Sequence, residues 1–556
     1  MIEVLSNAPN SVDLATSLPA MPRPRMTPRL YFAALRSARP RQLGARAMRP
    51  VNRRRKRFSP MPRTFRPVEA AADLWRSAAF SAADGVAERL PEGEVELLGR
   101  SIAYPPRSWD EAGLEQIRRF HLHYGEDILG CARLGEDRYL DAARAGLGAW
   151  IEANPPVTKV SWHPYPLSTR VGNWIAAASL EPSLATAAMS ECLWRQLLYL
   201  ERNVENDILG NHVIRNARAL VLGGLAFGEE RLLARGFGLL DRELPEQILP
   251  DGGHYERSPV YHALVLRDLL EVQAAAETSR FDAVIDQMKV FAACLGRPDG
   301  RPALFNDGGF DIAPDLGDFL PESRHGLALF PETGYAVVRD ESLWLAFDCG
   351  LAAPLFLPPH AHADALSFQL WIGASPVVVD PGTFTYESGR ERSRFRGTSA
   401  HATVAVDGAD QFQFVGAFRA LGIPPVEILN ASGSALEGSI TAEFEGFRHV
   451  APGVTHRRRV SWSVHQISLE DQIEGRGRHR LESALPLAPG IEVEDRPVLR
   501  AGGLGIEPIG PVDWAVEQRV VSDRFFHSTS APAVVARGEL DLPVTLGWNL
   551  RLPEGR

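Results

Sequence analysis

The chain has 556 residues, a formal net charge of −9, 45% hydrophobic residues and 23% charged residues. At about 150 residues per domain, this length allows two to four domains. The composition is that of a folded globular protein and excludes a wholly disordered, collagenous or coiled-coil chain. No stretch of about 18 apolar residues without charge occurs, so we expect no transmembrane segment.

The charge is distributed unevenly along the chain. Residues 1–67 form a Pro- and Arg-rich leader with a balance of +13, so the remainder carries −22. Within this leader, Thr27 to Met48 can form a short amphipathic helix that is broken at Pro40. The leader is either an arm that packs on the body of the protein or a patch for nucleic acid or another anionic surface. We favour the arm and expect no nucleic-acid partner, because no nucleic-acid-binding motif follows.

The segment from 68 to 322 has a helical pattern. Turn-forming Gly, Pro, Asn and Asp residues separate stretches in which apolar residues recur three and four positions apart. Consecutive helices with short connections predict helix pairs that stack in a ring or solenoid. The stretches are Leu114–Leu134, Tyr139–Ile151, Leu184–Leu200, Ala217–Phe227, Arg231–Ile248, Val260–Ala276 and Phe281–Leu295.

The segment from 323 to 556 changes to alternating and short apolar runs. Turn signals separate these runs at short intervals, which predicts an antiparallel β-sandwich. Helices followed by strands indicate an α+β protein with two segregated domains. The clearest runs are Gly334–Arg339, Leu343–Asp348, Ser367–Ile372, Val377–Asp380, Thr403–Val406, Val460–Val464 and Val544–Leu550.

Two polar clusters lie at predicted helix starts. Asn211 and His212 begin one helix, where Asn is most often a cap. Ser258 and Pro259 have the pattern of an N-cap and first helical residue, and Tyr261 follows them. Taken alone, the aromatic residues there are more often packing groups than reactive ones.

A third cluster precedes a predicted strand. His360 and His362 are two residues apart and therefore face the same side of an extended chain. Asp380 ends the next apolar run, and His401 precedes another strand. Two or three histidines with a carboxylate are a plausible zinc set, and the alternative is a hydrogen-bonded histidine cluster without metal. The four cysteines form no CxxC pair, which excludes a cysteine-rich zinc site.

Together, these clusters resemble the heparinase II/III-like polysaccharide lyases. The resemblance implies an incomplete (α/α) toroid at 68–322 and an antiparallel β-sandwich at 323–556, with the active site in the cleft between them. The basic segment at 27–49 is similar to the family's leader. The motifs are Asn211-His212, SPVYH (258–262), HAHADALSF (360–368), VVVDPGTFTY (377–386), HATVAVDG (401–408) and, as a further similar stretch, WHPYPLSTRVGNW (162–174).

By this resemblance, the protein cleaves a uronic acid-containing polysaccharide by β-elimination. Asn211, helped by His212, neutralises the substrate carboxylate while charge develops next to it. Tyr261 matches the family's catalytic Tyr and His360 its catalytic His. Tyr261 serves as both base and acid when the C5 proton and the leaving group are syn, and His360 is the base when they are anti. An unperturbed Tyr has a pKa of about 10, so we expect nearby Arg257 or His262 to perturb it.

The resemblance also suggests the metal ligands. His362, Asp380 and His401 match the family's zinc ligands, and such a zinc would be structural, holding the strands beside His360. No organic cofactor is implied.

Substrate contacts are expected from five residues. Arg170, Asn173 and Trp174 line the cleft or, on the alternative reading, pack between helices. Arg257 adds a cation near Tyr261. Arg215 stands where the family often has an acidic residue, which would favour a more anionic substrate or a simple ion pair.

Two other function classes remain open. The protein could be a glycoside hydrolase, which needs two carboxylates about 5–10 Å apart, with Asp251, Glu256 and Asp307 as candidates. It could also be a non-catalytic glycan-binding protein of exopolysaccharide or capsule assembly. The substrate class suggests the periplasm or cell envelope, but no standard signal peptide is visible, which leaves the cytoplasm open. A homodimer is also left open.

Overall fold

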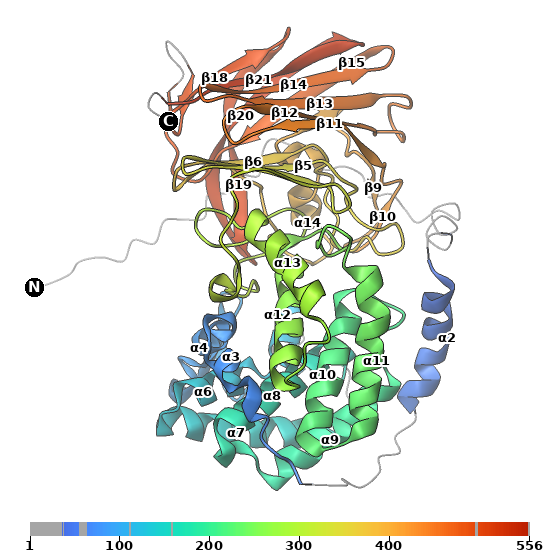
Figure 1. Cartoon of the computed structure of the whole chain (residues 1–556), viewed down its shortest axis with the longest axis vertical. Coiled ribbons are helices and arrows are strands. Elements are labelled where there is room, and N and C mark those ends of the chain that lie inside the picture. Colours follow the sequence, from blue (N-terminus) through green and yellow to red (C-terminus); the bar gives the residue numbers. More distant parts are fainter. Residues whose placement is uncertain are drawn as a thin grey trace, which may run out of the picture.

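A helical N-terminal half and a β-sheet C-terminal half lie one above the other (Figure 1). The computed structural model describes residues 36, 38–54, 64–110, 113–156, 160–494 and 499–553. Over these residues, no helix combines the length and the apolar character needed to cross a membrane. The order of helices followed by antiparallel sheets confirms the predicted fold class, and the last long helix ends before residue 322 while the first strand of the β part begins after it.

The helical part is built from pairs of neighbouring helices with short connections. The stretch predicted as one helix over Leu114–Leu134 is divided, because Gly125 has a left-handed backbone at φ 72°. A short hairpin, β1 (Glu94–Leu97) with β2 (Arg100–Ala103), is inserted. The helices are α3 (Ala72–Arg76), α4 (Ala82–Ala87), α5 (Gln116–His121), α6 (Glu126–Leu134), α7 (Asp137–Ala153), α8 (Pro164–Leu180), α9 (Ala187–Arg202), α10 (Asn211–Phe227), α11 (Glu230–Gln247), α12 (Pro259–Ala275) and α13 (Asp282–Leu295).

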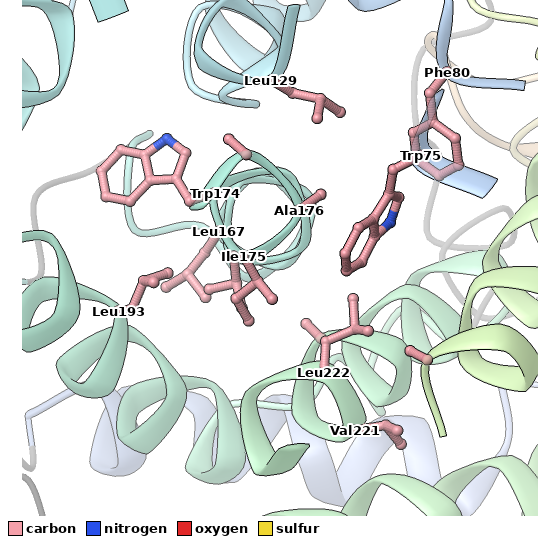
Figure 2. Packing of buried hydrophobic residues seen from close by; sticks show 14 of the residues in the cluster. Trp75, Phe80, Leu129, Leu167, Trp174, Ile175, Ala176, Leu193, Val221 and Leu222 are labelled. Carbon is pink, nitrogen blue, oxygen red and sulfur yellow. The ribbon is translucent and has the colours of Figure 1, made fainter. Parts of the chain in front are cut away.

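Helix α8 was not predicted from apolar periodicity, and its surroundings explain why. Figure 2 shows α8 end-on, with Leu129 of α6, Leu193 of α9, Leu222 of α10 and Trp75 of α3 around it. Because neighbours cover almost its whole circumference, nearly every residue of α8 is buried. A helix buried all round has no polar face and shows no amphipathic pattern.

The β part contains three large antiparallel sheets. Each of the seven predicted runs overlaps a strand. The sheet nearest to the helices has the order β3 (Gly326–Phe330), β4 (Tyr335–Arg339), β5 (Leu343–Asp348), β6 (Phe368–Ile372), β7 (Ser375–Val378). A second has the order β19 (Asp513–Arg524), β20 (His527–Asp541), β15 (Arg478–Pro486), β8 (Val404–Val406). The third runs β11 (Val426–Gly433), β12 (Gly438–Glu445), β13 (Thr455–Trp462), β14 (Gln466–Glu474), β21 (Val544–Arg551), β18 (Leu504–Ile509), β17 (Arg500–Ala501), β16 (Val493–Glu494).

Two long connections of the β part bring polar residues to the helices. One joins β5 to β6 and carries His360 and His362, and the other joins β7 to β8 and contains α14 (Arg390–Phe395). The first of them touches the segment that leaves the helical part, since the Asp307 N–H donates to the carbonyl of His360 at 3.1 Å. The candidate site therefore lies where the two halves meet.

The part of the leader around helix α2 packs on the rest of the protein mainly through charge. Helix α2 (Pro40–Arg54) begins at Pro40, where the predicted helix was expected to break, and Thr27–Leu35 lies outside the described residues. Arg41 pairs with Glu243 at 2.5 Å and Arg49 with Asp207 at 2.9 Å, while the Arg39 guanidinium lies 3.5 Å from the ring centre of Phe356. These contacts support the interpretation of the leader as an arm.

The close packing of α4 on α6 gives a stability prediction. A Cβ at Gly130 would lie 2.0 Å from the backbone oxygen of Ala83, so Gly130→Ala must push the two helices apart. We expect this substitution to cost about 1–3 kcal/mol and to lower the midpoint of thermal unfolding. Gly148→Ala in α7 is the matched control, because nothing lies within 4 Å of its Cβ position. It should stabilise the helix by about 0.5–1 kcal/mol, and equal midpoints for the two variants would contradict this packing.

Candidate active site

Asn211 occupies the first turn of α10, but it does not cap the helix. Gly210 is the N-cap, and no side chain caps this end. The Asn211 backbone N–H and the side-chain Nδ2 instead donate to the two oxygens of Glu256, at 3.0 and 2.8 Å. Both residues are buried, so the capping alternative is wrong. An amide Nδ2 carries two protons, and one of them remains for another partner.

His212 is held beside Asn211 by a buried carboxylate. Its Nδ1 lies 3.1 Å from Glu205, and its ring packs on Tyr165 with 4.3 Å between ring centres. Burial alone would raise the pKa of Glu205, but His212, His163 and Asn216 lower it to about 2. The ionised Glu205 therefore accepts the Nδ1 proton of His212, and Nε2 of the neutral ring is then an acceptor without a proton.

Tyr261 and His360 come together from the two halves of the protein. Their rings pack with 3.9 Å between centres and an angle of 30°. The Tyr261 hydroxyl lies 2.9 Å from the hydroxyl of Tyr386, which belongs to the connection between β7 and β8. Ser258 caps α12 as predicted, because its hydroxyl accepts the N–H of Tyr261 at 3.2 Å. This hydrogen bond fixes the position of Tyr261 in the first turn of the helix.

Asp307 binds both His360 and His362 and thereby fixes the orientation of their rings. One carboxylate oxygen lies 3.1 Å from Nδ1 of His360, and the other lies 3.0 Å from Nε2 of His362. The guanidinium of Arg392 pairs with both oxygens of this fully buried carboxylate. Burial would raise the pKa of Asp307, but Arg392 and the two histidine hydrogen bonds hold it well below its usual range. Since Asp307 only accepts hydrogen bonds, it assigns the proton of His360 to Nδ1 and leaves Nε2 as a base.

Arg257 and His262, the residues expected to perturb the pKa of Tyr261, make their hydrogen bonds to other groups. Arg257 donates to the backbone oxygens of Glu332 and Thr333, both at 3.0 Å. His262 accepts the N–H of His254 and bonds the carbonyl of Met288. Burial, with the neighbouring Tyr386, raises the pKa of Tyr261 well above its ordinary value. Tyr261 is therefore a protonated hydroxyl, suited to donate a proton.

A candidate metal cluster adjoins this group. Ligand atoms of His362, Asp364 and His401 lie within 4.8 Å of one another. Nδ1 of His362, Nε2 of His401 and both oxygens of Asp364 are buried without hydrogen-bond partners. Buried polar atoms without partners are costly, and here they converge on one point, so the donor set fits a metal ion.

The third member of this cluster differs from the expected one. Asp380 lies behind His401, with 2.9 Å between its Oδ2 and Nδ1, and its Oδ1 accepts the N–H of Gly382. Asp364 takes the place expected for Asp380, and Asp380 orients His401 as Asp307 orients His362. Such carboxylate–histidine pairs are the usual support of a metal site.

The five expected substrate contacts are largely occupied by partners inside the protein. Arg170 is fully buried and donates to Gln196 and to the backbone oxygens of His123 and Ser161. Asn173 donates to the carbonyl of Tyr124, and the buried Trp174 packs edge-on against Trp150. These three predictions are corrected to packing between helices, which was the alternative.

The two remaining cations are also engaged. Arg215 is buried, donates to Asp268 at 2.5 Å and lies 5.4 Å from the ring centre of Tyr165. It is an ion-pair member, as one of the two interpretations expected. Arg257 is held by the backbone contacts described above, so both guanidiniums have partners inside the protein.

The carboxylates proposed for a hydrolase are similarly engaged. Asp251 accepts the N–H and hydroxyl of Thr333, Glu256 holds Asn211, and Asp307 holds Arg392 and two histidines. None of the three offers a free acid and base pair across a bond. The hydrolase alternative therefore has no support in this geometry.

Sequence reasoning missed Asp307, Asp364 and Tyr386 as members of the site. Tyr386 and Asp364 lie within the quoted motifs, so a closer comparison of those motifs would have suggested them. Asp307 had been considered only as a hydrolase carboxylate. Its role depends on contacts with Arg392, 85 positions along the chain, which local sequence does not reveal.

The chain is similar to proteins of known sequence and structure. The chain is similar to a heparin-sulfate lyase of Pedobacter heparinus, with 23% identity over 327 residues that span 49% of each chain. It is also similar to the FtsZ-localized protein C of Caulobacter vibrioides, with 24% identity over 63% of this chain and 61% of that protein. A solved structure of heparinase III superposes with a TM-score of 0.69 at 16% identity, covering 92% of this chain and 89% of that one. At this identity, the structural likeness supports the fold alone.

Family profiles cover both halves of the protein. The profile described as heparinase II/III N-terminus matches residues 123–307, and the one described as heparinase II/III-like, C-terminal, matches residues 322–521. The two matches follow one another in the order of the helical and β parts and together span well over half of the chain. The chain therefore belongs to the heparinase II/III-like family.

Proposed function

We propose that this protein is a polysaccharide lyase that cleaves a uronate-containing anionic polysaccharide by β-elimination. The observation that carries the proposal is that the rings of Tyr261 and His360 pack against each other close to Asn211. This places an acid, Tyr261, and a base, His360, next to an amide donor. The similarity to a heparin-sulfate lyase supports the same substrate class. The matched region spans 49% of that heparin-sulfate lyase and 61% of the FtsZ-localized protein C, less than two thirds of either.

His360 is the group we assign to take the proton from C5 of the uronate. Its Nδ1 proton is directed to Asp307, so the Nε2 lone pair is available. Oε2 of Glu256 lies 3.8 Å from Nε2 and stabilises the imidazolium formed when the proton arrives. Acid–base catalysis of this kind is worth about 10²–10⁴ in rate.

Tyr261 is the group we assign to protonate the leaving oxygen. As the C5–H electrons form the C4–C5 double bond, the C4–O bond breaks and its electron pair takes the Tyr261 proton. The Tyr386 hydroxyl, 2.9 Å away, then donates to the resulting phenolate. The proton on His360 returns to Tyr261 through solvent, which restores both groups.

Asn211 supplies a donor for the uronate carboxylate, and His212 adds a second donor from Nε2 when its ring is doubly protonated. The C5 proton becomes removable only when the charge that spreads onto this carboxylate is stabilised. The second Nδ2 proton of Asn211 and the ring of His212 lie on adjacent residues at the start of α10. The positive end of the helix dipole adds to their effect.

We also propose that the candidate metal cluster holds a structural zinc. His362, Asp364 and His401 would be the protein ligands, and two imidazoles with a carboxylate suit Zn²⁺. The ion would fix the loops that carry His360. The acid–base steps described above use only side chains of the chain itself.

The lyase assignment predicts how single substitutions affect turnover. The wild-type protein should produce unsaturated ends, followed by near-ultraviolet absorbance, on at least one polymer of a uronate panel. Tyr261→Phe and His360→Ala should lower kcat by about 10²–10⁴-fold. Tyr386→Phe, which removes one hydrogen bond to a charged intermediate, should lower it about 10–100-fold.

Tyr139→Phe is the matched control, since Tyr139 lies in α7 away from the site, and its turnover should equal that of the wild type. Full activity of Tyr261→Phe would contradict the mechanism. Reducing ends without the near-ultraviolet signal would indicate a hydrolase, and binding without cleavage would indicate a glycan-binding protein.

The metal proposal predicts an order of affinities. Asp364→Asn removes a direct ligand and should abolish stoichiometric zinc, measured by elemental analysis and chelator competition. Asp380→Asn removes the support of His401 and should weaken zinc binding by about 10–100-fold. Asp407→Asn is the control, because it alters a similar carboxylate–histidine pair, with His479, outside the cluster. The reverse order for Asp364 and Asp380 would make Asp380 the ligand, and no bound zinc in the wild type would refute the proposal.

A further inference from the structure

An exposed aromatic side chain lies at the tip of a small hairpin next to the site. The hairpin consists of β9 (Gln413–Phe414) and β10 (Ala420–Leu421). Phe418, in its loop, is 48% exposed. Exposing an aromatic ring forgoes the favourable burial of its apolar surface, and the mechanism above does not use this residue.

The hairpin tip is fixed by two buried arginines. Arg392 donates from Nε to the carbonyl of Ala417 at 3.2 Å, and Arg396 donates to the same carbonyl at 2.7 Å and to that of Gly416. The Arg396 guanidinium also lies 3.9 Å from the ring centre of Phe414. Since Arg392 at the same time holds Asp307, the tip is tied to the group that orients His360.

Phe418 contacts the tyrosine pair directly. Its ring meets that of Tyr386 edge-on, with 5.8 Å between centres and an angle of 67°. The Tyr386 hydroxyl is hydrogen-bonded to that of Tyr261. One side of Phe418 therefore packs against the site, while nearly half of its surface remains open to solvent.

We propose that Phe418 is a stacking platform for the sugar unit that adjoins the cleaved linkage. This inference rests on the proposed function. A pyranose ring presents apolar C–H faces, and a rigid phenyl ring can cover one of them at little entropic cost. The phenyl ring of Phe418 has no polar group that could form hydrogen bonds with the sugar hydroxyls. Phe418 therefore supplies contact area and orientation, while hydrogen-bond donors elsewhere supply specificity.

The neighbouring residue fits the same occupant. Arg419 follows Phe418 in the loop and is exposed. Among the described residues, its guanidinium forms no ion pair with a carboxylate. An anionic sugar on the Phe418 ring would bring its charge close to this cation.

The test compares Phe418→Ala, Phe418→Leu and Phe418→Trp on a polymer that the wild-type protein cleaves. We expect Phe418→Ala to raise KM about tenfold, the size of one aromatic stacking contact, with kcat within about twofold. Phe418→Trp keeps an aromatic face and should stay within about threefold of the wild-type KM, with Phe418→Leu between the two. All three should unfold at the wild-type temperature, because the ring is half exposed.

Trp514→Ala is the matched control. Trp514 is another exposed aromatic residue, but it lies at the start of β19, roughly 35 Å along the strand from Phe525, which packs on Tyr386. Its substitution should leave KM unchanged. A KM for Phe418→Ala within twofold of the wild type, or an equal effect of Phe418→Ala and Phe418→Trp, would overturn the platform.

Binding measurements separate this inference from the lyase assignment. Titration calorimetry in the Tyr261→Phe background should show about tenfold weaker oligosaccharide binding when Phe418→Ala is added. If the wild type binds uronate polymers without cleaving them, that weakening still supports the platform while the lyase assignment fails. If the wild type neither cleaves nor binds any of them, both are overturned.

Discussion

The buried ion pair between Asp307 and Arg392 is the constraint on which the rest of the site depends. A fully buried carboxylate is costly unless every oxygen has a partner, and Asp307 satisfies this by binding Arg392, His360 and His362. The pair joins the segment that leaves the helices to both long connections of the β part. One carboxylate thus positions the candidate base, one histidine of the candidate metal cluster and, through Arg392, the hairpin that carries Phe418.

The charged side chains described above pair mainly with other groups of the protein. They contribute to substrate binding only close to the site. The body outside the leader carries −22, which is unfavourable for attracting a polyanion, although salt screens this repulsion beyond about 8–10 Å. Arg170, Arg215 and Arg257 are engaged internally, and the leader arginines Arg41 and Arg49 pair with acidic residues of the helical part. Substrate affinity is therefore expected from hydrogen bonding and aromatic contact close to Asn211 and Tyr261.

Features encoded by short sequence stretches were predictable, and those formed by distant segments were not. The start of α12 followed from Ser258 and Pro259, and the strands followed from alternation, since both signals are local. Helix α8 gave no amphipathic signal because other helices surround it. The internal role of Arg170 is not visible in the sequence, because its partners, Gln196 and two backbone oxygens, are brought together only by folding. For the same reason, the sequence does not reveal Asp307 as the centre of the site, nor the position of Asp364 beside His362 and His401 in the candidate metal cluster.

The position of the proton on the ring of His360 tests the role of Asp307 most directly, because Asp307 acts by holding that proton on Nδ1. Nitrogen-15 NMR of histidine-labelled protein, with the signal of His360 assigned by its loss in His360→Ala, distinguishes a protonated Nδ1 from a protonated Nε2 in the neutral ring. The account predicts a proton on Nδ1 and a free Nε2. A neutral His360 with its proton on Nε2 would contradict the assignment of His360 as the base and of Asp307 as the group that prepares it.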